Sequence, residues 1–88
     1  MREPSEIGRR LKEVRESVGI TPNALSLKMD PMPGRAWAGW VESGEILEPS
    51  VDSIRRACEV LGACVEYVLL GTGPRFVEGH PTEGSAAE

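Results

Sequence analysis

The 88-residue sequence has few of the residues from which metal sites and active sites are usually built. It contains two cysteines, Cys58 and Cys64, and a single histidine, His80. A zinc site takes four ligands and a disulfide framework needs several cysteine pairs, so we expect neither and interpret both cysteines as reduced thiols. No constellation of serine, cysteine or carboxylate surrounds His80 in sequence. We therefore predict no catalytic residue, no metal site and no cofactor, and we do not expect an enzyme.

Long apolar runs are also missing. No stretch approaches the roughly 18 consecutive apolar residues of a membrane span, and the N-terminal segment MREPSEIGRR is charged where a signal peptide would be apolar. We expect a cytoplasmic protein with no membrane partner.

The chain lacks an excess of positive charge, since its formal net charge is -4. The charges are unevenly distributed, with seven basic against five acidic residues over 1 to 40, and two against six over 41 to 71. Nonspecific affinity for nucleic acid comes from lysine and arginine, so any phosphate-facing surface is expected in the first half of the chain.

Apolar residues at helical spacing predict helices at about 6 to 18, 22 to 29, 35 to 43, 51 to 61 and 64 to 70. Ser5, Thr21 and Ser50 are suitable N-caps, and glycines at 19, 44, 62 and 71 are suitable stops. The fourth helix is expected to bury a stripe formed by Val51, Ile54, Ala57, Cys58 and Leu61.

The second and third predicted helices are separated by Asp30-Pro31-Met32-Pro33-Gly34, which cannot continue a helix. The third helix contains Gly39, which lowers helix propensity by about 1 kcal/mol relative to alanine, so packing must hold this helix. Residues 72 to 88 are rich in glycine, proline, serine and glutamate. We predict one domain over 1 to 71 followed by a disordered acidic tail over 72 to 88.

Four segments carry a resemblance to a known family. They are IGRRLKEVRESVGIT from Ile7, NALSLKM from Asn23, WVESGE from Trp40, and PSVDSIRRACEVLGACVEYVLLG from Pro49 to Gly71. Together they resemble the XRE/Cro-like helix-turn-helix family of phage repressors and small bacterial regulators. The resemblance implies an all-α, five-helix domain like that of lambda repressor. It also implies a homodimeric transcriptional regulator that binds double-stranded DNA sequence-specifically, with its third helix in the major groove.

The resemblance also implies roles for individual residues. Its base-reading positions fall on Arg35, Ala36, Gly39 and Trp40, where the guanidinium of Arg35 suits guanine and Ala36 suits a thymine methyl. The positions that contact the DNA backbone fall on Thr21, Asn23, Lys28 and Ser43. Trp37 falls at a position near the DNA or the turn, so it is a possible contact to DNA or to a partner. Arg15 and Glu42 match a basic-acidic pair that in related repressors forms a buried salt bridge.

Three departures from the family pattern support an alternative. Pro22 replaces a glutamine that often binds phosphate, the turn is two residues longer than usual, and the acidic loop Glu45-Ile46-Leu47-Glu48 replaces basic residues. Two tryptophans on one short helix also fit either a core anchor or an exposed apolar patch. The alternative is a protein-interaction module that uses Trp37, Trp40, Ile46 and Leu47 as its contact face.

Overall fold

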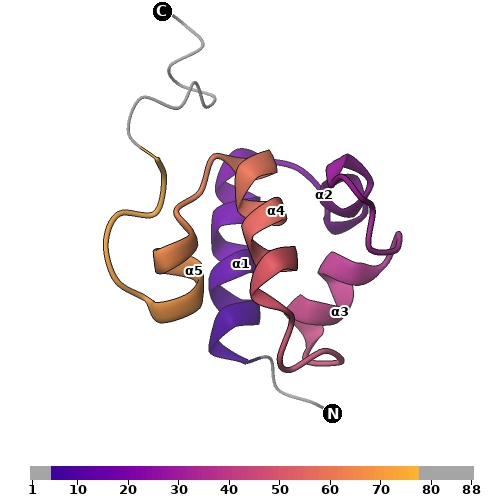
Figure 1. The fold of residues 1–88 in the computed structure, drawn as a ribbon, viewed down its shortest axis with the longest axis horizontal. Helices are drawn as coiled ribbons and strands as arrows, with labels where there is room; N and C mark the ends of the chain where they lie inside the picture. Colours follow the sequence, from indigo (N-terminus) through magenta and orange to yellow (C-terminus); the bar gives the residue numbers. More distant parts are fainter. Residues whose placement is uncertain (1–4, 78–88) are drawn as a thin grey trace, which may run out of the picture.

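The computed structural model describes residues 5–77, which form five helices around one core (Figure 1). The helices are α1 (Glu6–Val18), α2 (Pro22–Lys28), α3 (Trp37–Ser43), α4 (Val51–Leu61) and α5 (Val65–Leu70). Within this range the only β-type pairing is an isolated antiparallel bridge between Ala63 and Phe76. The prediction of an all-α domain is confirmed.

Local capping chemistry sets most of the helix boundaries. The side chains of Ser5, Thr21 and Ser50 accept hydrogen bonds from backbone N–H groups in the first turns of α1, α2 and α4. The residues after α1, α3, α4 and α5 are glycines with positive φ, a conformation that costs other residues more. Capping side chains and glycines in the sequence therefore predict where most of these helices begin and end.

The core is made by the inward stripes of all five helices. Fully buried side chains include Leu11 and Leu25 from the first two helices, Val41 from α3, Ile54 from α4 and Val68 from α5. The prediction that Val51 belongs to the buried stripe of α4 is wrong, because this residue is 62% exposed. It is the first residue of α4, where the helix extends beyond the packed core that begins one turn later at Ile54.

The arrangement places α2 and α3 on one side of the molecule and α5 on the other, with α1 and α4 between them (Figure 1). Helix α2 packs against α3 and α4, while α1 contacts α3, α4 and α5. The α2–α3 unit is therefore supported from behind by the two longest helices, and its other side lies away from α5.

The prediction of a disordered tail from residue 72 is wrong for residues 75–77. Cys64 donates its backbone N–H to Arg75 at 2.8 Å, Val77 donates to Gly62 at 2.8 Å, and Phe76 packs against the core. Arg75 also pairs with Glu13 of α1 at 2.5 Å. One aromatic side chain and two backbone hydrogen bonds thus hold a segment whose composition indicates disorder. Residues 78–88 of the predicted tail, including His80, lie outside the described residues.

No helix within residues 5–77 is long and apolar enough to cross a membrane.

Candidate functional site

The α2–α3 unit begins as predicted, but α3 starts two residues later than expected. Gly34 adopts φ 127° and its carbonyl accepts the backbone N–H of Trp37 at 3.1 Å, which forms a turn over 34–37. Ala36 is the residue before the helix and has no side chain that can cap it. Arg35 and Ala36 therefore lie in the turn that leads into α3, not in its first helical turn. The predicted range of 35 to 43 is corrected to Trp37–Ser43.

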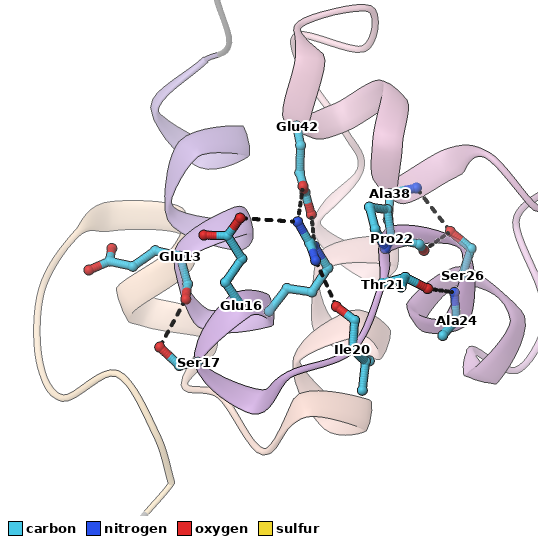
Figure 2. A network of polar contacts seen from close by, with 11 residues as sticks. Glu13, Glu16, Ser17, Ile20, Thr21, Pro22, Ala24, Ser26, Ala38 and Glu42 are labelled. Carbon is cyan, nitrogen blue, oxygen red and sulfur yellow. Dashed lines mark hydrogen bonds and ion pairs between the residues drawn. The ribbon is translucent and has the colours of Figure 1, made fainter.

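A buried serine attaches the start of α3 to α2 (Figure 2). Ser26 is fully buried, donates its hydroxyl to the carbonyl of Pro22 at 3.2 Å and accepts the backbone N–H of Ala38 at 2.9 Å. Backbone N–H groups in the first turn of a helix lack partners within the helix, so Ser26 supplies the cap that Ala36 cannot. We did not single out Ser26 from the sequence. The only signal was a serine at an inward position of an otherwise apolar helix stripe.

A second polar contact attaches the end of α3 to α1. Arg15 donates from Nε and Nη2 to the two carboxylate oxygens of Glu42, at 2.7 and 2.9 Å. Its Nη1 donates to the carbonyl of Ile20 at 2.6 Å, and the carboxylate of Glu16 lies 3.8 Å from Nη2 (Figure 2). Arg15 and Glu42 are both buried, so the pair expected from the resemblance forms a bidentate bond inside the domain. It connects α1, the entry to α2, and α3.

The two tryptophans point in different directions. Trp37 is only 6% exposed and belongs to the core together with Ala38 and Val41, whereas Trp40 is 52% exposed. The prediction that Trp37 is a possible contact to DNA or a partner is therefore wrong. With its first helical residue at 37, α3 turns Trp37, Ala38 and Val41 toward the core, and Trp40 lies on the outer face.

The remaining base-reading candidates are accessible to different degrees. Arg35 is exposed, and Ala36 and Gly39 are half-buried. A side-chain carbon added at Gly39 would first meet the Cβ of Pro22, at 4.0 Å. The middle of α3 therefore lies beside the beginning of α2, which brings Gly39 close to the segment that carries Thr21 and Asn23.

The backbone-contact candidates are all exposed, but two of them also have structural contacts. Thr21 accepts the N–H of Ala24 at 3.1 Å as the cap of α2, and Ser43 donates to the carbonyl of Trp40 at 3.3 Å. Lys28 has no ion pair or side-chain hydrogen bond within residues 5–77, and the same is true of Arg35. These two cations near the connection between α2 and α3 are available to an external anion.

An apolar and acidic loop adjoins the same unit. The backbone N–H of Ile46 donates to the carbonyl of Trp40 at 3.0 Å, which holds the loop against the end of α3. Leu47 is 52% exposed, Ile46 is half-buried, and Glu48 is exposed. Of the four residues predicted for a protein-contact face, Trp40, Ile46 and Leu47 thus remain accessible, and Trp37 does not.

Comparison with protein-family models, with curated proteins and with solved structures found no match to this chain. Its function is therefore inferred from the exposed residues of α2, of α3 and of the turn between them. We call this the α2–α3 surface, and it includes Thr21, Asn23, Lys28, Arg35, Trp40 and Ser43.

Proposed function

We propose that the chain is a lambda-repressor-like helix-turn-helix domain of the XRE/Cro-like kind, and that it regulates transcription by binding double-stranded DNA. The supporting observation is the way α3 is held. Its inner side is fixed by Trp37, Ala38 and Val41 and by polar contacts to Ser26 and Arg15, while Trp40 lies on its outer side. A recognition helix needs this combination of rigid attachment and an accessible face.

Arg35 is the residue to which we assign base reading. It stands exposed in the turn before α3, and its guanidinium presents parallel donors that match the O6 and N7 acceptors of guanine. Beside it, Ala36 offers a small apolar contact for a thymine methyl. Gly39 adds no side chain between the helix backbone and the groove, and Trp40 supplies apolar contact area.

Contacts to the DNA backbone are assigned to residues at the two ends of α2 and at the end of α3. Thr21 and Asn23 lie at the beginning of α2, next to Gly39 of α3, and Lys28 lies at the end of α2. Lys28 contributes charge and the others contribute hydrogen bonds, which together position α3 without reading sequence. Ser43 contributes in the same way at the end of α3.

Two copies of the domain are proposed to act together. Helix-turn-helix dimers bind two half-sites about one helical turn of DNA apart, so the operator of a homodimer is close to a palindrome. Selection of bound sequences from a random duplex library tests both DNA reading and two-fold symmetry. We expect enrichment of a palindromic sequence.

The role of Arg35 is tested on the selected duplex by fluorescence anisotropy over a range of salt concentrations. Arg35→Lys keeps the charge but loses the paired donors, so it should lose discrimination at one base pair, about 1 to 3 kcal/mol. Arg35→Ala should lose this discrimination and also overall affinity. Lys12→Ala removes one exposed charge from α1 and is the matched control. Equal effects of Arg35→Ala and Lys12→Ala would contradict the assignment.

A specific observation favours a second function, that of a protein-interaction module. Trp40 of α3 and Leu47 of the loop that follows α3 are both about half exposed, and Leu47 is followed by exposed Glu48. Apolar contacts of this kind are frequent at the centre of protein interfaces, and carboxylates beside them repel phosphate. Absence of duplex binding at low salt, together with a stable complex with another protein that Trp40→Ala abolishes, would favour this function over DNA binding.

A further inference from the structure

A cavity of about 550 Å³ lies between α4, α5 and the segment that ends at Val77. Its lining residues come from α4, from α5 and from the segments next to them. Helix α5 lies on the opposite side of the molecule from α2 and α3 (Figure 1). Apolar side chains from Ala63, Val65 and Val77 make part of its wall, and both cysteines line it. The two residues, Cys58 in α4 and Cys64 at the start of α5, thus line the same open pocket.

Both sulfurs are available as ligands. The cysteines are not joined in a disulfide, and neither thiol makes a hydrogen bond within residues 5–77. Cys64 occupies the N-cap position of α5 but makes no side-chain cap bond there. Cys58 is only 1% exposed, so its thiol is buried without a polar partner while it lines the cavity. A buried polar group in this situation gains from a ligand that satisfies it.

The charges around the cavity favour a cation. Glu59 and Glu66 line it together with one basic residue, Arg55, whose guanidinium is already paired with Asp52 at 2.5 Å. Burial and, to a smaller extent, the charges of Cys64 and Glu59 together raise the pKa of the Cys58 thiol to about 12. The neighbouring negative charges that disfavour a free thiolate would be compensated by a bound positive ion.

We propose that Cys58 and Cys64 together bind one soft d10 metal ion, of the Cu(I) type, in this cavity. Within the described residues no three histidine, cysteine or acidic side chains gather as metal ligands, so a four-coordinate zinc site is not present there. Thiolates select soft ions, and Cu(I) is stable with two of them. Each sulfur binds as its thiolate, any proton that it carries goes to solvent, and no oxidation takes place. The site is independent of the proposed DNA binding.

The test uses the full chain without oxygen and with a phosphine reductant. Cu(I), supplied as its acetonitrile complex, is titrated against a chromophoric Cu(I) chelator that competes with the protein. We expect one ion per chain. Loss of a contact outside the ligand shell costs about 10- to 100-fold in metal affinity, so Cys58→Ala and Cys64→Ser should each bind at least about 100-fold more weakly. Both variants are small changes, and their metal-free unfolding midpoints show whether they fold.

Two results would overturn the proposal: unchanged affinity in either folded variant, or one ion shared between two chains, seen as a doubled mass in sedimentation.

Discussion

Arg15 shows how much of this domain depends on a single side chain. Its guanidinium bonds to Glu42 of α3 and to the carbonyl of Ile20 before α2, from a position on α1 where it is 7% exposed. Removal of either charged partner leaves the other charge buried without compensation, which is costly in a low-dielectric interior.

We expect Arg15→Ala to lower the free energy of unfolding by about 3 to 5 kcal/mol, measured by urea denaturation. Arg9→Ala is the control. Arg9 pairs with Glu6 on the exposed face of the same helix, and such pairs contribute about 1 kcal/mol or less. A loss below about 0.5 kcal/mol for Arg15→Ala would show that the pair does not carry the connection between α1 and α3.

The buried thiol of Cys58 gives a pH-dependent prediction. Its pKa is raised from the ordinary 9.0 to about 12, first by burial and then by Cys64 and Glu59. Because the unfolded chain ionises first, the contribution of this thiol to stability is complete below about pH 9 and is lost as pH rises toward 12. The expected loss is about 1.4 kcal/mol per pH unit in that window.

This loss is measured as the difference in free energy of unfolding between wild type and Cys58→Ala, with metals chelated and thiols reduced. Taking the difference cancels the contributions of the groups that both chains share. Between pH 9.5 and 10.5 the difference should fall by roughly 1 kcal/mol. A constant difference over this range would mean that the thiol titrates alike in the folded and unfolded chains.

At the scale of elements, the close approach of α1 to α3 depends on Gly8. A Cβ at this position would overlap the carbonyl oxygen of Val41, so α3 lies directly against the backbone of α1. Gly39 of α3 is different, since a Cβ there meets nothing closer than 4.0 Å. Replacement by alanine is therefore expected to have opposite effects on stability at these two helical glycines.

We expect Gly8→Ala to destabilise the domain by about 1 to 3 kcal/mol, because the overlap outweighs the better helix propensity of alanine. Gly39→Ala should instead stabilise it by up to about 1 kcal/mol. Thermal unfolding of the two variants measures both effects. Similar shifts in the same direction would contradict the close packing of α1 on α3.

The elements that could be predicted from the sequence are those whose ends are marked by local chemistry. The caps Ser5, Thr21 and Ser50 act within three residues of themselves, so their helices have the expected starts. The start of α3 was placed too early because no side chain caps it, and its true cap, Ser26, lies on another helix. A bond between residues 12 apart leaves no local pattern.

The same distinction applies to the candidate site. The burial of Trp37 and the exposure of Trp40 depend on where α3 begins, which the spacing alone did not fix. The order of residues 75–77 depends on backbone bonds to Gly62 and Cys64, and composition carries no record of them. Contacts between distant segments are thus what the sequence left undetermined.

At the scale of the whole molecule, the net charge and the acidic loop after α3 both disfavour binding to DNA. The net charge is -4, and the loop after α3 is acidic where the resemblance implies basic residues. Lys28 at the end of α2 and Arg35 in the turn before α3 have no ion pair or side-chain hydrogen bond within residues 5–77, whereas exposed Glu48 follows α3. If the α2–α3 unit faces the phosphates of DNA, the carboxylate of Glu48 repels them. Replacing Glu48 by a basic residue should then strengthen DNA binding through a contact at this loop.

We therefore expect Glu48→Lys to raise affinity for the selected duplex by about tenfold at low salt, or about 1.4 kcal/mol. The slope of log affinity against log salt should steepen by about 1, as expected for one added phosphate contact. Glu66→Lys makes the same change in net charge on α5, on the opposite side of the molecule (Figure 1), and should leave the slope nearly unchanged. Anisotropy titrations of both variants at several salt concentrations separate a contact at the loop from a general effect of charge.

Two outcomes would contradict this prediction. Equal gains in affinity from Glu48→Lys and Glu66→Lys would mean that the loop after α3 does not face the DNA. No gain from Glu48→Lys would leave the protein-interaction function as the better account of the α2–α3 surface.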